Sequence, residues 1–451
     1  MFARLLEQIN APSDRPAIIT PQGDTSWNSL RQLMGSLTQE YNSLARRRVG
    51  LALPGTAKGY GSLAALDSLK CDVFLFDAEL PTSEILRRAR GLRLGACVIF
   101  GPTTEDHGET YELPKEADWS GSGTVTILTS GSTGQPKAAT HTWQSLLRPV
   151  RAQGNSESCT SRWLLTYRPD LYAGLQVALQ CMAATGTLVV SEPSLGPAAT
   201  IRLMQSTRVQ AVPATPSFWR RLVLSAPDSF SHLAVRQITL GGEVVEQSLL
   251  DALRSLLPKA RISHIYATTE LGRCFAVHDG LAGFPASYLG RPNTDGVELR
   301  EQEGELWVKS PNAMSGYDPH SAARAVFGEW VPTGDLIAVN NGRVHFKGRR
   351  SDVINVAGSK VHPLEVERII RAIPGVADVH VFGKRSAVTG ELVACQLVPL
   401  RNQRPDDLRR QVHRICMEQL SAPQRPRFIS LVPQIEISRS GKTLRRGLAL
   451  A

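Results

Sequence analysis

The most distinctive chemistry in this sequence lies in residues 124–140, TVTILTSGSTGQPKAAT. An apolar run leads there into small and hydroxylated residues, followed by Pro136 and Lys137. Gly131 and Gly134 permit backbone conformations that expose amide N–H groups to a ligand. The hydroxyl donors of this loop are Thr129, Ser130, Ser132 and Thr133. With the Lys137 cation, the set predicts a polyphosphate site.

Two alternatives apply to this loop when it is taken alone. A Walker A loop, G-x-x-x-x-G-K-[ST], does not fit it, and the later Gly441-Lys442-Thr443 has Glu436 or Ile437 where the leading glycine would stand. A turn rich in serine and glycine without any ligand is the other alternative.

The surrounding pattern predicts an α/β fold, because apolar runs alternate with amphipathic segments over the first hundred residues. Strands are expected at 16–20, 49–55, 71–77 and 96–100, and helices at 26–44, 62–69 and 82–92. The polar stretch 101–123 is expected to be a loop, and α/β segments continue to about residue 276. Residues 304–346 favour a small β unit in which Asn341-Gly342 makes a hairpin turn.

The last hundred residues predict a second, smaller domain of the α+β type. Helices are expected at 363–372 and 405–420, and strands at 377–383 and 391–398. We therefore expect a large N-terminal domain of α/β subdomains plus the small β unit, 1–348, and a C-terminal domain, 349–451.

Five further segments, together with the loop, resemble the adenylate-forming enzymes, which include acyl-CoA synthetases, peptide-synthetase adenylation domains and luciferases. In order they are HIYATTELG (264–272), GELWVKSPNAMSGY (304–317), VPTGDLIAV (331–339), GRRSDVINVAGSKVHPLEVE (348–367) and ISRSGKTLRR (437–446). The resemblance covers nearly the whole chain. It implies that a carboxylate attacks the α-phosphate of ATP, that pyrophosphate leaves, and that the acyl group then passes to a thiol.

The resemblance also implies roles for individual residues. Glu270 would hold Mg²⁺, Thr269 would meet the α-phosphate, and Lys137 with the loop hydroxyls would receive the pyrophosphate. Lys442 would stabilise charge between the carboxylate and the α-phosphate, from a domain that rotates between the two half-reactions. The remaining nucleotide contacts implied are Gly241, Gly242, Glu243, Tyr266, Ala267, Thr268, Asp335 and Arg349.

Within that set, Tyr266 would stack on adenine and Asp335 would accept hydrogen bonds from the ribose hydroxyls. Arg349 would make a second ribose or phosphate contact. Gly241, Gly242 and Glu243 would line the adenine and acyl sites, although for Glu243 a purely structural role is equally well supported.

The acyl site departs from the family pattern. The segment RPDLYAG places Leu171 or Tyr172, together with Gly242, at the acyl pocket. Amino-acid adenylating domains need an aspartate near that point, and Asp170 is one or two residues out of register. This favours a substrate other than an α-amino acid.

The hinge and the thiol path are assigned in the same way. The hinge falls on Ser351 with Asp352 beside it, and Gly358 in the following loop would let the thiol approach the backbone. In the family the usual glycine after the adenine-stacking aromatic residue is Ala267 in this chain.

Charge and composition restrict the partners. The chain has a net charge of +10, and residues 401–451 hold eleven basic against four acidic residues. Such a tail attracts polyanions, and without aromatic residues interleaved among its basic residues or a zinc-finger spacing it favours a phosphorylated thiol or an acidic carrier over nucleic acid. The seven scattered cysteines, with no C-x-x-C pair, favour a reducing compartment. Without a leader sequence or a long apolar run, we expect a cytoplasmic protein that does not insert into membranes.

The sequence therefore predicts a compact ATP-dependent ligase that resembles acyl-CoA synthetases of the aryl or o-succinylbenzoate type. It would work with Mg²⁺ and pass the acyl group of a small carboxylic acid to coenzyme A. The first rival is a stand-alone enzyme that loads the phosphopantetheine arm of an acyl or peptidyl carrier protein. The second is a non-catalytic nucleotide-binding partner, which the presence of both Glu270 and Lys442 disfavours.

Overall fold

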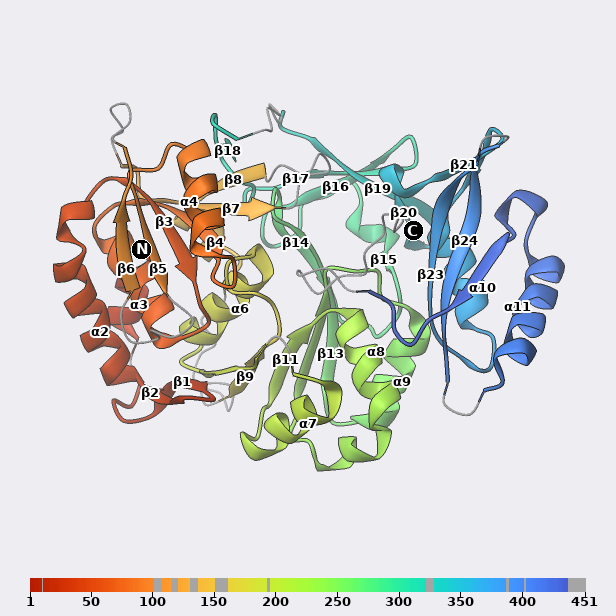
Figure 1. Ribbon diagram of the computed structural model, residues 1–451, viewed down its shortest axis with the longest axis horizontal. Coiled ribbons are helices and arrows are strands. Elements are labelled where there is room, and N and C mark those ends of the chain that lie inside the picture. The colour runs from red at the N-terminus through yellow and green to blue at the C-terminus, as the bar shows by residue number, and fades with distance from the viewer. Residues whose placement is uncertain are drawn as a thin grey trace. The chain divides into compact units, whose positions relative to one another are not determined.

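The computed structural model in Figure 1 describes most of the chain. The described residues are 1–9, 11–100, 108–114, 121–129, 137–150, 161–192, 195–321, 328–386, 389–400 and 403–436. They form two compact units, which we describe separately. The first unit comprises Met1–Leu281, Pro292–Val297 and Lys309–Glu329, and the second comprises Ala282–Arg291, Glu298–Val308 and Trp330–Ala451. The predicted domain boundary between residues 348 and 349 stays a prediction.

The first sheet of the first unit has a parallel centre with an antiparallel pair at each edge. In spatial order its strands are β14 (Gly272–Val277), β13 (Arg261–Thr268), β12 (Gln237–Gly241), β11 (Ala211–Ala214), β9 (Arg162–Leu165), β10 (Thr187–Val190), β1 (Pro16–Thr20) and β2 (Gly23–Ser26). Parallel strands need crossover helices, which cover the faces of the sheet.

The second sheet of this unit also has a parallel centre, with one antiparallel pair at one edge and two at the other. Its strands in spatial order are β18 (Gly316–Tyr317), β8 (Lys137–Thr142), β7 (Thr124–Thr129), β4 (Asp72–Asp77), β3 (Arg48–Leu53), β5 (Ala96–Phe100) and β6 (Gly108–Glu112). The described helices of the unit are α1 (Phe2–Gln8), α2 (Trp27–Glu40), α3 (Ala57–Ser68), α4 (Thr82–Gly91), α5 (Trp143–Leu147), α6 (Tyr172–Ala183), α7 (Pro197–Ser206), α8 (Pro216–Ser225) and α9 (Gln247–Leu256). Short 3-10 helices follow at Asn42–Leu44 and Pro227–His232.

The two sheets of the first unit share one apolar core. Along β4, Val73 and Leu75 face this core, while the alternate residues Phe74 and Phe76 face a second cluster on the other side of the sheet. Burial on both faces explains why these strands are continuous apolar runs rather than alternating ones.

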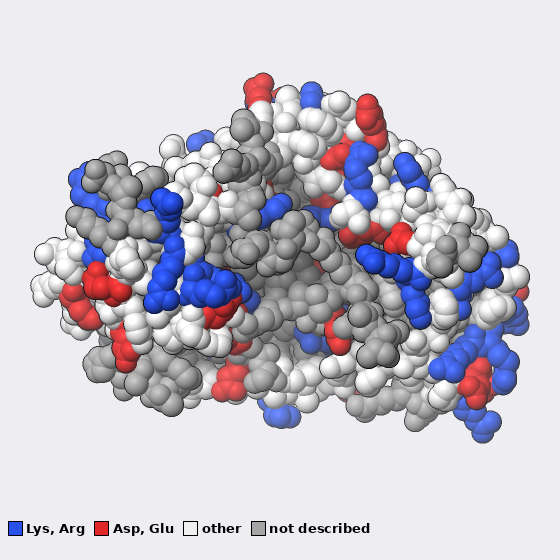
Figure 2. Space-filling view, turned by 45° about the horizontal axis from the view of Figure 1, so that its top comes forward, with Lys and Arg blue, Asp and Glu red and all other residues white. Residues whose placement is uncertain are grey.

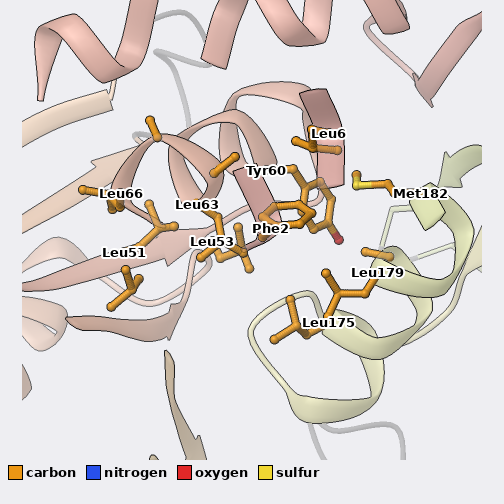
Figure 3. Packing of buried hydrophobic residues seen from close by; sticks show 14 of the residues in the cluster. Phe2, Leu6, Leu51, Leu53, Tyr60, Leu63, Leu66, Leu175, Leu179 and Met182 are labelled. Carbon is orange, nitrogen blue, oxygen red and sulfur yellow. The ribbon is translucent and has the colours of Figure 1, made fainter. Parts of the chain in front are cut away.

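Helix α1 lies where the core reaches between the sheets. Figure 3 shows Phe2 of α1 beside Tyr60 of α3, and Leu6 of α1 and Leu175 of α6 belong to the same buried cluster. The ring of Phe2 also stacks on that of Trp143, with centroids 5.3 Å apart. Side chains from widely separated parts of the chain therefore stabilise one packing unit.

The second unit contains two smaller, mainly antiparallel sheets. One has the order β15 (Phe284–Pro285), β20 (Arg343–Arg349), β19 (Val331–Asn340), β17 (Glu305–Lys309) and β16 (Glu298–Gln302). The other has the order β22 (Ser359–Val361), β21 (Ile354–Val356), β24 (Gly390–Pro399) and β23 (Val376–Ser386), with β25 (Phe428–Leu431) parallel to β24. Helices α10 (Pro363–Arg371) and α11 (Pro405–Gln419) contribute to its core, and short 3-10 helices lie at Ala286–Tyr288, Arg350–Asp352 and Ala422–Gln424.

Several local predictions are confirmed. Strands β19 and β20 form the predicted hairpin, with φ of 49° at Asn341 and 73° at Gly342, as a type I′ turn requires. Helix α10 begins at Pro363, and α11 begins at Pro405. In each helix the proline occupies the first turn, where its missing N–H costs nothing.

Two predictions are wrong. The stretch 101–123 is not all loop, because Gly108–Glu112 forms β6, an edge strand paired with β5. Its side chains are polar because they face solvent, while the backbone supplies the pairing. Helix α3 begins at Ala57 rather than at residue 62, and its residues Ala57 and Gly59–Asp67 are buried, so it lacks an amphipathic stripe.

Two further features are the state of the cysteines and the hydropathy of the helices. The six described cysteines are free and buried, whereas Cys159 lies outside the described residues. Within the described part of the chain, no helix is long and apolar enough to cross a membrane. Figure 2 shows Lys and Arg in separate groups with Asp and Glu among them on the face in view.

A buried ion pair connects an interior strand of the second sheet to the segment that follows its edge strand β18. Arg48 at the start of β3 lies 2.9 Å from Asp318, just beyond β18, and both side chains are less than a tenth exposed. Arg48 also donates to the Leu92 carbonyl, and Asp318 accepts from the His320 amide. Removing one charge from such a pair strands the other in a low-dielectric interior.

We expect Asp318→Asn to lower the free energy of unfolding by about 3 kcal/mol or more, because Arg48 would lose this carboxylate. Urea denaturation measures the change. The matched control is Glu112→Gln, which removes an exposed carboxylate 2.7 Å from the neighbouring Arg47 and should cost about 1 kcal/mol or less. Equal losses for the two variants would contradict the assignment.

Candidate active site

The predicted phosphate loop connects two paired strands. Thr129 at the end of β7 lies opposite Lys137 at the start of β8 in the antiparallel register. The Lys137 Nζ lies 5.7 Å from the ring centroid of Tyr317. Residues 130–136, which include the predicted contacts Ser130, Gly131, Ser132, Thr133 and Gly134, lie outside the described part, so their roles stay predictions.

Glu270, the predicted metal carboxylate, is held from two sides. The Tyr317 hydroxyl donates to Glu270 Oε1 over 3.1 Å, and the Met314 amide donates to the Glu270 carbonyl over 2.9 Å. Burial, together with the nearby Glu270 charge, raises the pKa of Tyr317, so the hydroxyl stays protonated and keeps donating. The carboxylate therefore has a fixed direction and one oxygen that Tyr317 leaves open.

Such a carboxylate suits Mg²⁺, which uses few protein ligands together with phosphate oxygens and water. No group of three or more potential protein ligands occurs among the described residues, so a site of the zinc or calcium type is not formed by them. The donor set fits a cation that arrives with the nucleotide.

Tyr266, the predicted adenine contact, lies near the end of β13. Its ring stacks on that of Phe275 from β14, with centroids 5.3 Å apart and planes inclined by 18°. Phe275 therefore covers one face of the Tyr266 ring and fixes the plane of that ring. Ala267 and Thr268 follow, with Ala267 packed against the main core and the Thr268 hydroxyl accepting from the Leu271 amide.

The Gly241-Gly242-Glu243 segment leaves the end of β12 and turns sharply. Gly242 has φ of 86°, a conformation that favours glycine. Glu243 Oε2 accepts from the Ser217 amide at the start of α8 over 2.9 Å, and Tyr167 donates to the Gly241 carbonyl. A carboxylate at a helix N-terminus is a stabilising arrangement, which supports the structural role of Glu243.

The predicted acyl-pocket residues stand at the start of α6. Leu171 precedes the helix and is half-buried. Tyr172 is buried, and its hydroxyl accepts from the Arg273 amide over 3.1 Å. Tyr172 thus braces β14 against α6, and of the two alternatives Leu171 is the more accessible.

Asp170 forms an ion pair with an arginine side chain. Arg168 donates to both its carboxylate oxygens and also lies 2.9 Å from Asp77. Asp170 is 3% exposed, and this burial raises its pKa despite the arginine. The carboxylate is committed to a buried ion pair, which agrees with the expectation that it does not receive a substrate ammonium group.

The predicted ribose-binding residues lie together in the second unit. Asp335 and Arg349 are cross-strand partners on β19 and β20, and Arg349 Nε donates to Asp335 Oδ1 over 3.1 Å. Glu305, which sequence reasoning missed, accepts from the Gly334 amide and from Arg350. This buried carboxylate therefore connects the Thr-Gly-Asp turn to the residue next to Arg349.

The hinge and thiol-path residues also lie in the second unit. Ser351 and Asp352 belong to one short 3-10 helix, where the Ser351 hydroxyl donates to the Asp352 carboxylate. Ala357 and Gly358 form a two-residue turn between β21 and β22, with φ of 48° and 87°. Among the described residues, no atom outside the adjoining ones lies within 4 Å of the position that a Cβ at Gly358 would take.

That turn borders an open depression of about 650 Å³. Its lining comes from the β21–β22 turn and from the facing ends of β23 and β24. Lys442, the predicted catalytic lysine, lies outside the described residues, so its role stays a prediction.

Tyr317 is a further functional residue that sequence reasoning did not single out. It is the last residue of the segment GELWVKSPNAMSGY, one of the segments that carry the family resemblance. The available signal was a tyrosine ending that motif. Its pairing with Glu270 could not be read from spacing, because 47 positions separate the two residues.

Known proteins are similar to this chain in sequence and in fold. A fatty acid–acyl-carrier-protein ligase of Mycobacterium marinum (strain ATCC BAA-535 / M) is 27% identical over 366 residues, covering 72% of this chain and 67% of the relative. A 2-succinylbenzoate–CoA ligase of Lactococcus lactis subsp. lactis (strain IL1403) is 24% identical over 448 residues, covering 91% and 94%. An anthranilate CoA ligase solved with anthranoyl-AMP superposes with a TM-score of 0.78 at 18% identity, covering 98% and 95% of the two chains.

The family models divide along the chain in the same order as the motifs. The model described as AMP-binding enzyme matches residues 68–318, and the model described as AMP-binding enzyme C-terminal domain matches residues 365–442. The predicted α/β fold class, with a large N-terminal and a smaller C-terminal part, is confirmed by the solved structures. Because the first model alone spans more than half of the sequence, this chain belongs to the family of AMP-binding enzymes.

Proposed function

We propose that this chain is an AMP-forming acid–thiol ligase. An oxygen of the substrate carboxylate attacks the α-phosphorus of ATP, and the bond to pyrophosphate breaks. The thiol sulfur of coenzyme A then attacks the acyl carbon, and AMP leaves. The observation that supports this best is the fixed Glu270 carboxylate. It accepts a hydrogen bond from Tyr317, which lies on β18 beside the strand that begins at Lys137.

The chain's own residues would divide the work of the first step. Glu270 would hold Mg²⁺, which supplies positive charge to the phosphates when it is bound. Lys137 and the loop N–H groups would receive the departing pyrophosphate, and Thr269 would contact the α-phosphate. Lys442 would balance the charge between the two reacting anions.

A small aryl or o-succinylbenzoate-type acid is the proposed substrate class. Its support is the match to the Lactococcus lactis 2-succinylbenzoate–CoA ligase over nearly the full length of both chains. The buried Asp170–Arg168 pair argues against α-amino acids.

Coenzyme A is the proposed thiol, and the holo form of an acyl carrier protein is the second candidate. The basic C-terminal segment would attract either a phosphorylated thiol or an acidic carrier. The carrier alternative is favoured by one observation, the similarity to the Mycobacterium marinum carrier-protein ligase.

ATP–pyrophosphate exchange with a panel of aryl, fatty and amino acids tests the proposal. We expect exchange with at least one aryl acid and none with α-amino acids. With that acid, coenzyme A and a holo acyl carrier protein should then be offered as acceptors at equal concentration. Exchange with amino acids alone would overturn the substrate class, and acylation of the carrier alone would favour the second candidate.

Glu270→Gln should lower Mg²⁺-dependent adenylation about 100-fold, because the amide keeps the shape and the Tyr317 contact but loses the charge. Pyrophosphate exchange measured against Mg²⁺ concentration checks this. The thermal midpoint should barely change. Glu112→Gln, an exposed carboxylate of the same unit, is the control and should retain full activity, whereas unchanged Mg²⁺ dependence in the Glu270 variant would rule out the metal role.

Lys442→Ala should lose adenylate formation about 100-fold or more yet still convert a supplied acyl-adenylate to the thioester. A variant with bulk at Gly358 should do the reverse, because that turn is assigned to the thiol path. Leucine at this φ of 87° would be strained, so Gly358→Asn is the better variant, since asparagine tolerates the left-handed region.

The second hairpin of the same unit supplies the matched control. Gly342 also occupies the second position of a two-residue turn, with φ of 73°. Among the described residues, no atom outside the adjoining ones lies within 4 Å of the position that a Cβ at Gly342 would take. Gly342→Asn should therefore cost the same backbone strain while leaving both half-reactions intact. Equal damage to both half-reactions by Lys442→Ala or by Gly358→Asn would contradict the division of labour.

A further inference from the structure

His141 is a buried residue on β8 that the proposed reaction does not use. It is fully buried, and its ring lies 5.6 Å from that of Tyr172. Its Nε2 is 2.7 Å from the carbonyl oxygen of Thr269, and its Nδ1 is 3.1 Å from Ser145 Oγ. Both ring nitrogens therefore have hydrogen-bond partners, one of them in the predicted nucleotide segment.

The partners determine where the imidazole carries its proton. Burial lowers the pKa of His141 to about 4, against the opposing effects of the Thr269 carbonyl and the Glu270 charge, so the ring is neutral near pH 7. A carbonyl oxygen can only accept a hydrogen bond, so the single N–H must lie on Nε2. The Nδ1 lone pair then faces the Ser145 hydroxyl, whose one hydrogen is within reach of both Nδ1 and the Thr142 carbonyl, 3.1 and 3.0 Å from Ser145 Oγ.

This hydrogen bond crosses from one sheet to the other within the first unit. Thr269 follows β13, the next-to-last strand of the first sheet, whereas His141 belongs to β8 of the second sheet. The bond fixes the plane of the Thr269–Glu270 peptide group. The next carbonyl, that of Glu270, accepts from the Met314 amide, so two consecutive peptide groups are held.

The same strand also fixes the other phosphate-side groups. Lys137 is the first residue of β8, directly after the phosphate loop. Strand β8 pairs with β18, and Ala139 lies opposite Tyr317. Ser315 donates to the Thr140 carbonyl and extends this pairing. Tyr317 in turn holds the Glu270 carboxylate.

We propose that His141 is a positioning residue for adenylation. By donating from Nε2 to the Thr269 carbonyl, it sets the distance between strand β8, which carries Lys137, and the segment Thr269–Glu270. A displacement of about 1 Å between groups that act on one phosphate chain can cost about 100-fold in rate. The inference rests on the proposed function, because it takes the phosphate and metal roles of those residues from it.

The bland alternative is a core histidine whose hydrogen bonds only satisfy its buried nitrogens. Two amide side chains separate the alternatives, since each imitates one ring nitrogen. The amide nitrogen of His141→Gln reaches about as far as Nε2 and can donate to Thr269. The amide of His141→Asn reaches about as far as Nδ1, so it can meet Ser145 but not Thr269.

We expect the glutamine variant to keep pyrophosphate exchange within about fivefold of the unaltered chain, and the asparagine variant to lose about 30- to 100-fold in kcat. The KM for the carboxylic acid should stay nearly constant in both. In ligand-free protein, hydrogen exchange of peptides covering residues 268–272 should be faster in the asparagine variant only. Equal kinetics and equal exchange in the two variants would overturn the inference.

The exchange measurement separates the two proposals. If the unaltered chain has no adenylation activity, the proposed function fails, whereas the hydrogen-exchange contrast still reports on the His141 contact. If the asparagine variant does not fold, ¹⁵N-histidine NMR of the unaltered chain decides: we expect the Nε2–H tautomer at neutral pH, and an Nδ1–H tautomer would overturn the inference.

Discussion

The pairing of β8 on both of its edges is the constraint on which the rest of this site depends. On one edge β7 brings the phosphate loop into register, and on the other β18 brings Tyr317 opposite Ala139. The Ala138 carbonyl accepts from the Asp318 amide, and Asp318 is the partner of buried Arg48. A strand held in this way gives the groups around it a common frame, which is what electrostatic preorganisation requires.

The local parts of this arrangement could be predicted from sequence. The loop motif stands between strand ends, and the Asn341-Gly342 turn needs only the conformational preferences of its two residues. The family resemblance identified Glu270 and Asp335 through motifs whose order and spacing match. These features depend on neighbours in the chain, so a short window contains the information.

The contacts that orient the site could not be predicted in this way. His141 and Thr269 are 128 positions apart, and no periodicity connects them. Helix α3 was misjudged because burial on all sides removes the amphipathic stripe, and β6 because an edge strand can be polar. In each case tertiary packing decides, and it overrides the local pattern.

The position of α1 in the core has a consequence for synthesis. Phe2 and Leu6 belong to the same core cluster as Leu175 and other residues of α6, which leave the ribosome about 170 residues later. At elongation rates of about 5 to 20 residues per second, α6 is made roughly 9 to 34 seconds after α1, whereas Tyr60 of α3 follows α1 within about 3 to 12 seconds. The core around α1 can therefore be completed only in stages, first against α3 and later against α6.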